Sequence, residues 1–195
     1  SLRGSGVTRR HGHTYGSSVE RDRSGTLFGE ASMTGTAGRN TWVGGGAMQR
    51  DTFRSVDVPR FDYTYAIPGV FVQDDYAAAR WLTASGSARV DVHSEFGSFF
   101  SPRLSLLFRP SSQWIARISG GRGHFAPSPF TEETDATGLT PLAPLGHLEP
   151  ERADSIAADI TWRKVPFEIT TTIFHSRIAR AQMFRRLEAC NGAGG

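Results

Sequence analysis

The sequence predicts an all-β chain that folds as part of an antiparallel, up-and-down transmembrane β-barrel. The composition is rich in glycine, with 22 residues, and in aromatic side chains, at 11%, whereas hydrophobic residues make up only 38%. Such a mixture is typical of strands joined by many turns. The other two observations are strands of about ten residues that alternate apolar with polar side chains, and an alternation of short with long connections.

About eight strands are expected in chain order, each bounded by turn residues. They cover residues 26–36, 41–52, 67–76, 81–91, 101–109, 114–123, 152–162 and 167–178. At roughly 3.3 Å per residue and a tilt near 45°, about ten residues span about 25 Å, the height of the apolar band of a membrane barrel. Strands of soluble proteins more often contain about five or six residues. The length of the predicted strands therefore favours a membrane barrel.

Alternation gives most of these strands one apolar and one polar face. In residues 101–109, Leu104 and Phe108 point to one face and Arg103 to the other, and residues 81–91 show the same pattern. In a barrel the apolar face contacts lipid and the polar face lines a hydrated lumen. A half-buried strand of a soluble protein alternates in the same way, so the pattern alone leaves both alternatives open.

The lengths of the connections decide between these alternatives. Short connections of about four residues at 37–40, 77–80, 110–113 and 163–166 alternate with longer ones at 53–66, 92–100 and 124–151. Bacterial outer-membrane barrels alternate tight periplasmic turns with longer outer loops in this way. With an even number of strands, we expect both flanking segments on the outer side: residues 1–25 as a loop and residues 181–195 as a loop or tail.

Composition excludes several classes of function. The single cysteine, Cys190, excludes a disulfide framework. A net charge of +3 arises from scattered residues, so no nucleic-acid partner is predicted. No apolar run approaches the roughly 18 residues that a membrane helix needs.

No catalytic, metal or cofactor site is predicted. His93 and Ser101 are close in the sequence and have no nucleophile elbow, so a hydrolase is not indicated and we expect no enzyme. The stretch HGH (11–13) offers two imidazoles, but no Cys, Asp or Glu lies at ligand spacing along the chain. We expect a loop there, without a metal.

Two stretches resemble the barrel of TonB-dependent outer-membrane receptors. The segment GRGHFAPS (121–128) matches the family's Gly-rich GxGFxAPs element, with His124 as a departure, and LEPER (148–152) matches its Leu-x-Pro-Glu-Arg/Ser element. Upstream, PGVFVQDDY (68–76) and SPRLSLLFRP (101–110) are similar to two further strands of the family. The resemblance covers about residues 26–180 in order.

The resemblance implies a barrel of about 22 strands in the cell outer membrane, closed by a plug domain and surrounded by lipid. Of this barrel, residues 26–180 would form a part. It also implies energy-coupled uptake of a ferric siderophore, a cobalamin-like compound or a similar scarce ligand, driven by the TonB complex. We expect the plug, the N-terminal part that meets TonB and the final aromatic strand to lie outside these 195 residues.

Candidate site residues follow from the face or the strand end on which they lie. Charged residues expected to face the lumen, and to pair there or hold the plug, are Arg89, Asp91, Arg103, Arg109 and Asp159. The resemblance implies ligand contacts in the outer loops and lumen, where the candidates are Phe125, Phe130, His147 and Arg117. Tryptophans at short-turn ends, expected at the membrane interface, are Trp81, Trp114 and Trp162.

Two alternatives stay open at this point. A passive outer-membrane barrel would share the strands but have no plug. A soluble β-sandwich that binds a ligand would fold without detergent, whereas a receptor fragment would aggregate through its open sheet edges.

Overall fold

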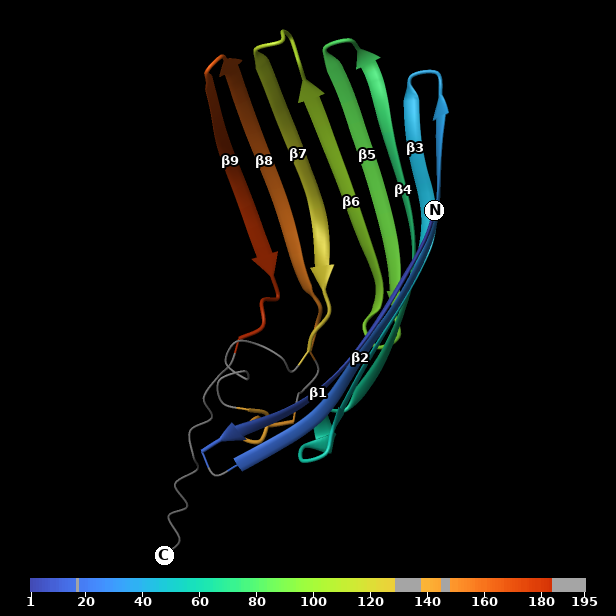
Figure 1. Ribbon diagram of the computed structural model, residues 1–195, viewed down its shortest axis with the longest axis vertical. Helices are drawn as coiled ribbons and strands as arrows, with labels where there is room; N and C mark the ends of the chain where they lie inside the picture. Colours follow the sequence, from blue (N-terminus) through green and yellow to red (C-terminus); the bar gives the residue numbers. More distant parts are fainter. Residues whose placement is uncertain (17, 129–137, 145–147, 184–195) are drawn as a thin grey trace, which may run out of the picture.

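In the computed structural model, one antiparallel sheet contains all the strands of the described residues, which are 1–16, 18–128, 138–144 and 148–183. Nine strands follow one another in the order of the chain, as Figure 1 shows. They are β1 (Leu2–Tyr15), β2 (Ser18–Ala37), β3 (Asn40–Ser55), β4 (Tyr63–Ala79), β5 (Leu82–His93), β6 (Gly97–Phe108), β7 (Trp114–Phe125), β8 (Glu151–Lys164) and β9 (Phe167–Ala179). A 3-10 turn, η1 (Pro59–Phe61), precedes β4. This confirms the predicted up-and-down topology, and no second sheet faces this one among the described residues, so a β-sandwich is wrong.

Each face of the sheet has its own chemistry, because paired residues of antiparallel strands share a face. One row across β5 to β8 contains Gly86, Leu104, Gly120 and Ile156. Leu104 is 70% and Ile156 55% exposed. We call this side the apolar face.

The neighbouring row, one residue along each strand, lies on the opposite side and contains Ser85, Ser105, Ser119 and Ala157. We call that side the polar face. The predicted alternation of apolar and polar residues is therefore kept in register from β5 to β8, and is not only a pattern within each strand.

The sheet has two different ends. At the short-turn end, at the top of Figure 1, the connections are residues 38–39, 80–81, 109–113 and 165–166. At the long-loop end they are residues 16–17, 56–62, 94–96 and 126–150. The strict alternation of short and long connections was thus wrong in part. The expected loop at 92–100 is a tight turn, because the strands continue to His93 and resume at Gly97, whose φ of 80° suits a sharp reversal.

The expected loop at 1–25 was also wrong. Residues 2–15 form β1, and β2 begins at residue 18, with Gly16 at a φ of 62° between them. The sheet consequently has nine strands where about eight were expected. Leu2 pairs with Ala31, part-way along β2, so the chain does not start at the long-loop end as predicted.

The strands at the start of the sheet are longer than a bilayer requires. β2 has 20 residues, β3 has 16 and β4 has 17, whereas about ten residues span the apolar core of a membrane. The surplus lies at the long-loop end, where β1 and β2 bend across the bottom of Figure 1. We call this part the long-loop half and the part next to the short turns the short-turn half.

The buried hydrophobic cluster lies in the long-loop half. It consists of Phe53, Val58, Phe61 and Leu139, with Tyr63 and Leu142 packed against it. No helix among the described residues is long and apolar enough to cross a membrane.

Candidate functional site

A row of aromatic rings crosses the sheet in the long-loop half, and we call it the aromatic belt. Its members are Phe53, Tyr63, Tyr65, His93, Phe96, Phe99 and His124. Tyr63 and Tyr65 are two residues apart in β4, so both rings point to the same face and their centroids are 4.4 Å apart. From Tyr65 the row continues to His93 at 4.7 Å. The belt is therefore a continuous row of packed rings beside the loops, in which the tyrosines are partly exposed.

The belt continues across two more strands. The ring of His93 lies 4.8 Å from Phe96 and 6.1 Å from Phe99, between centroids. Phe99 stacks on His124 at 5.3 Å with an interplanar angle of 11°. The belt thus reaches β7, although the pairing of β6 with β7 stops at Arg103 and Gly121.

His93 places a polar donor within this aromatic wall. The residue is only 3% exposed, and its Nδ1 accepts hydrogen bonds from the backbone N–H groups of Glu95 and Phe96 at 3.1 and 3.3 Å. Because Nδ1 acts as an acceptor, the proton of the neutral ring lies on Nε2. Within the described part of the chain, Nε2 has no hydrogen-bond partner. An unpaired buried donor is costly, but Nε2 is enclosed by its neighbours, so a ligand oxygen reaches this N–H only if the surrounding side chains move.

A segment of the loop between β7 and β8 is held against β2. The Glu20 carboxylate accepts hydrogen bonds from the backbone N–H groups of Leu139 at 2.9 Å and Thr140 at 2.7 Å. Gly138 precedes them with a φ of 79°, and a Cβ at this position would collide with the Glu20 carboxylate. The close approach therefore requires glycine.

A second contact holds the same segment from the neighbouring loop. The Arg60 guanidinium donates to the carbonyl oxygens of Thr140 and Leu142, both at 2.9 Å. Arg60 also lies over the Phe61 ring, with its Cζ 4.9 Å from the centroid. Glu20 and Arg60 together bring residues 138–142 over the buried cluster.

Several groups at this end of the sheet, beyond the roughly ten residues that cross a bilayer, have shifted pKa values. Burial opposes the charge of Glu20, but the hydrogen bonds from Leu139 and Thr140 outweigh it and hold its pKa below the ordinary value. The hydrogen bond from the Arg21 side chain lowers the pKa of Asp57, and the two side chains approach to 2.9 Å. Burial raises the pKa of Tyr63 to about 12. Glu20 and Asp57 are therefore charged at neutral pH and Tyr63 is neutral.

The charged residues predicted on the polar face are distributed over the short-turn half and the middle of the sheet. Arg89 and Asp91 form an ion pair with 2.7 Å between Nη2 and Oδ1. The Arg89 guanidinium also lies 5.9 Å from the centroid of Phe71. Gly69 stands opposite Asp91 in the register, and a Cβ there would collide with the Asp91 carboxylate.

The other predicted arginines have different neighbours. Arg117 stands opposite Asp159 in the register of β7 and β8. Arg109 donates to Thr83 Oγ1 at 3.3 Å. Arg103 stands opposite Ser87 on one side and Gly121 on the other. The structure therefore brings some of these charges together in pairs but does not gather all of them at one place.

Of the predicted ligand contacts, Phe125 lies at the end of β7 and is 58% exposed. It stands opposite Glu151 in β8. Phe130 and His147 lie outside the described residues.

The tryptophans lie near the short turns. Trp114 and Trp162 stand opposite each other in β7 and β8, and Trp81 stacks on Phe108 at 6.3 Å. Trp42, which the prediction left out, lies near the same end in β3 and packs against Gly35.

Sequence reasoning missed the aromatic belt. Tyr63 lay in a segment predicted as a loop, and His93 was considered only as a partner of Ser101 in a hydrolase. The i, i+2 spacing of Tyr63 and Tyr65 was an available signal for a shared face. The pairing of β4 with β5 that brings Tyr65 to His93 could not be deduced from spacing.

The chain is similar to known proteins both in sequence pattern and in fold. A family model described as TonB dependent receptor-like, beta-barrel, matches residues 2–194. The siderophore receptor PirA from Pseudomonas aeruginosa superimposes with a TM-score of 0.69 at 17% identity, covering 90% of this chain and 38% of that one. A variant of the ferric enterobactin receptor PfeA from the same species gives a TM-score of 0.66 at 14% identity, covering 83% and 27%.

The copper transporter OprC gives a TM-score of 0.64 at 10% identity, covering 82% of this chain and 30% of that one. At these identities the superpositions support a shared fold. The chain spans well under half of the length of these solved relatives. No curated protein matched it.

Proposed function

The chain belongs to the TonB dependent receptor-like β-barrel family, and we propose that it forms part of an outer-membrane receptor for energy-coupled uptake of a ferric siderophore or a similar scarce ligand. Its apolar face would contact the lipid of the outer membrane, and its polar face would line the lumen. The receptor acts by binding and passage of its ligand, with no covalent step and no cofactor.

The observation that carries this proposal is the aromatic belt with His93 at its centre. A ferric siderophore presents planar chelating groups and oxygen atoms around the metal. Tyr63 and Tyr65 are partly exposed and suit contact with the planar groups. The buried Nε2–H of His93 would donate to an oxygen once the neighbouring rings move. Arg103 on the same polar face stands opposite Ser87 and Gly121 and would attract an anionic complex towards the lumen.

Two partners belong to the proposal. A plug domain would fill the lumen and meet the charged residues of the polar face, such as Arg103. The TonB complex of the inner membrane would supply energy through a part of the receptor outside this chain. The edge strands β1 and β9 would pair with the remaining strands of the barrel.

The test uses the full-length receptor in cells that lack their own siderophore receptors. Uptake of radioactive iron is measured with ferric catecholate, hydroxamate and carboxylate siderophores. We expect uptake of one class, its loss in cells without TonB, and a strong reduction by the Tyr65→Ala, His93→Ala double substitution. Ser105→Ala, on the polar face of the short-turn half, is the matched control and should leave uptake unchanged.

Two outcomes would contradict the proposal. Uptake that continues without TonB would favour a passive outer-membrane barrel. Equal uptake by the double variant and the wild type would remove the aromatic belt as the ligand site.

A further inference from the structure

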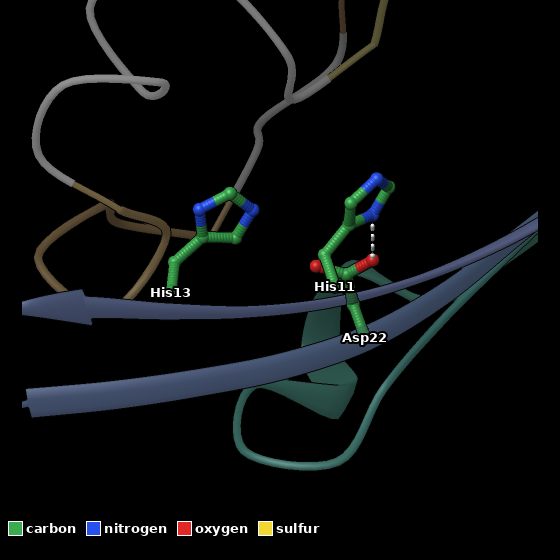
Figure 2. Close-up of side chains that lie close together, drawn as sticks. All are labelled: His11, His13 and Asp22. Carbon is green, nitrogen blue, oxygen red and sulfur yellow. Dashed lines mark hydrogen bonds and ion pairs between the residues drawn. The ribbon is translucent and has the colours of Figure 1, made fainter.

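Two imidazoles and a carboxylate meet on the polar face where β1 and β2 pair. His11 and His13 are two residues apart in β1, and Asp22 of β2 stands directly opposite His11. One ligand atom from each of the three residues lies within 4.8 Å of the others. Figure 2 shows both imidazoles on the same side of the ribbon, with Asp22 reaching towards His11 from the neighbouring strand. The sequence did not reveal this cluster, because Asp22 joins it only through the pairing of β1 with β2.

The distance between His11 and Asp22 suits a small cation. His11 Nδ1 and Asp22 Oδ1 are 3.0 Å apart. Two ligands of a tetrahedral ion with bonds of about 2.0–2.1 Å are separated by about 3.3 Å. A cation that replaces the shared proton would therefore require only a small movement of these two atoms.

His13 can supply a third ligand atom. Its ring centroid is 5.6 Å from that of His11, and the side chain is exposed, so the imidazole is free to turn about its side-chain bonds. On its other side the ring stacks on Tyr15 at 5.9 Å. His11 and Asp22 are less exposed, at 39% and 16% of their side-chain surface.

We propose that His11, His13 and Asp22 bind a divalent late transition-metal ion of the class of Zn²⁺, Cu²⁺ and Ni²⁺, with water completing the coordination. Imidazole nitrogen is a good ligand for these ions, whereas Ca²⁺ and Mg²⁺ take oxygen ligands. Three protein ligands leave a position open for exchange, which a closed structural site does not have. This inference rests on the geometry of β1 and β2 and is independent of siderophore uptake.

Some neighbouring charges oppose the binding of a cation at this site and others favour it. Arg9 lies on the same face of β1, two residues before His11, and opposes the binding of a cation. Glu20 stands opposite His13, but its two oxygens accept hydrogen bonds from the loop segment, so it contributes charge and not a ligand.

The test is calorimetric titration of the full-length protein, purified in detergent through an affinity tag free of histidine, with ZnCl₂, NiCl₂ and CuCl₂. We expect one binding site, whose affinity for the metal falls by at least about tenfold in His13→Ala. Even residues that only contact a metal ligand alter affinity by about 10–100-fold when they are replaced. Mg²⁺ and Ca²⁺ should not compete.

His175→Ala is the matched control, because it removes an exposed histidine from β9, far along the sheet. It should bind metal as the wild type does. For Cu²⁺, the electron paramagnetic resonance spectrum should show coupling to imidazole nitrogen that weakens in His11→Ala and in His13→Ala.

The proposal is overturned if the His11→Ala, His13→Ala double variant binds as tightly as the wild type. It is equally overturned if His175→Ala weakens binding as much as His13→Ala. Retention of the heat-modifiable band of a folded barrel in electrophoresis shows that a variant has folded.

Discussion

The short-turn half and the long-loop half of the sheet are stabilised in different ways. In the short-turn half, apolar side chains such as Leu104 and Ile160 are exposed on one face at 70% and 51%. In the long-loop half, Phe53 and Val58 are buried at 1% and 2% against the loops. The sheet thus contributes to this packed core only at its long-loop end, through β3 and β4.

The difference indicates that lipid surrounds the short-turn half of the sheet and water surrounds the long-loop half. A contiguous apolar face needs a cover, and lipid provides one without any further chain. In water, the long-loop half has to bury Phe61 and Leu139 within the protein itself. Variants that affect one half and spare the other test this comparison.

The largest effect is expected for Phe53→Ala. Removing a buried phenylalanine leaves a cavity and costs about 3–5 kcal/mol. We expect faster amide hydrogen exchange at Val58 and Leu139, which pack on Phe53. Phe100→Ala on the apolar face, where the ring is 53% exposed, should leave this exchange unchanged.

The next largest effect is expected for Leu104→Arg. A charge in the middle of the lipid-facing band costs about 2–4 kcal/mol. Folding of the full-length protein into lipid vesicles, followed in urea, measures it. Ser105→Arg on the polar face is the control and should fold nearly as the wild type does, whereas equal losses would show that the two faces do not differ.

A smaller effect is expected for Glu20→Gln. The amide can no longer accept strongly from both Leu139 and Thr140, and a buried group left without its partner costs about 1–3 kcal/mol. Protease cleavage near residue 140 should become faster. Glu30→Gln, in the middle of the same strand, should leave cleavage unchanged.

Glu20 also predicts a pH dependence of the same contact. The pKa of Glu20 is lower in the folded chain than in the unfolded chain. Its contribution to stability is therefore complete above the unfolded value of 4.5 and is lost as the pH falls through the folded value. Cleavage near residue 140 by an acid-active protease should increase in that range. In Glu20→Gln this increase should be absent.

The smallest effect is expected for Thr161→Val. The Oγ1 atoms of Thr161 and Thr170 are 2.9 Å apart across β8 and β9. A cross-strand pair of this kind contributes roughly 0.2–1 kcal/mol. Urea titration in vesicles should show a small loss of stability, and a loss as large as that of Leu104→Arg would contradict the account.

Much of the short-turn half could be predicted from the sequence, because its strands alternate over their whole length. The expected range 81–91 corresponds to β5 (82–93), and the tryptophans mark the short turns. The long-loop half could not be predicted to the same degree. In β1, arginine occurs on both faces, and the two aliphatic residues, Leu2 and Val7, lie on opposite faces, so residues 2–15 gave no separation of an apolar from a polar face.

The candidate sites depend on contacts between strands, which explains why they were missed. The aromatic belt needs Tyr65 beside His93, and the metal cluster needs His11 beside Asp22. Spacing within one strand indicates a shared face but does not give the register of its neighbour.

The most direct test of the two-faced sheet is spin labelling along β6 of the full-length protein in lipid vesicles. Native Cys190 is replaced by Ser, and single cysteines are introduced in turn at residues 103–108. Accessibility to lipid-soluble oxygen and to a water-soluble nickel complex is then measured. The account predicts that oxygen reaches labels at positions 104, 106 and 108. Labels at 103, 105 and 107 should be reached by the nickel complex or be shielded by protein. Equal access of both reagents along the strand, or the opposite phase, would contradict it.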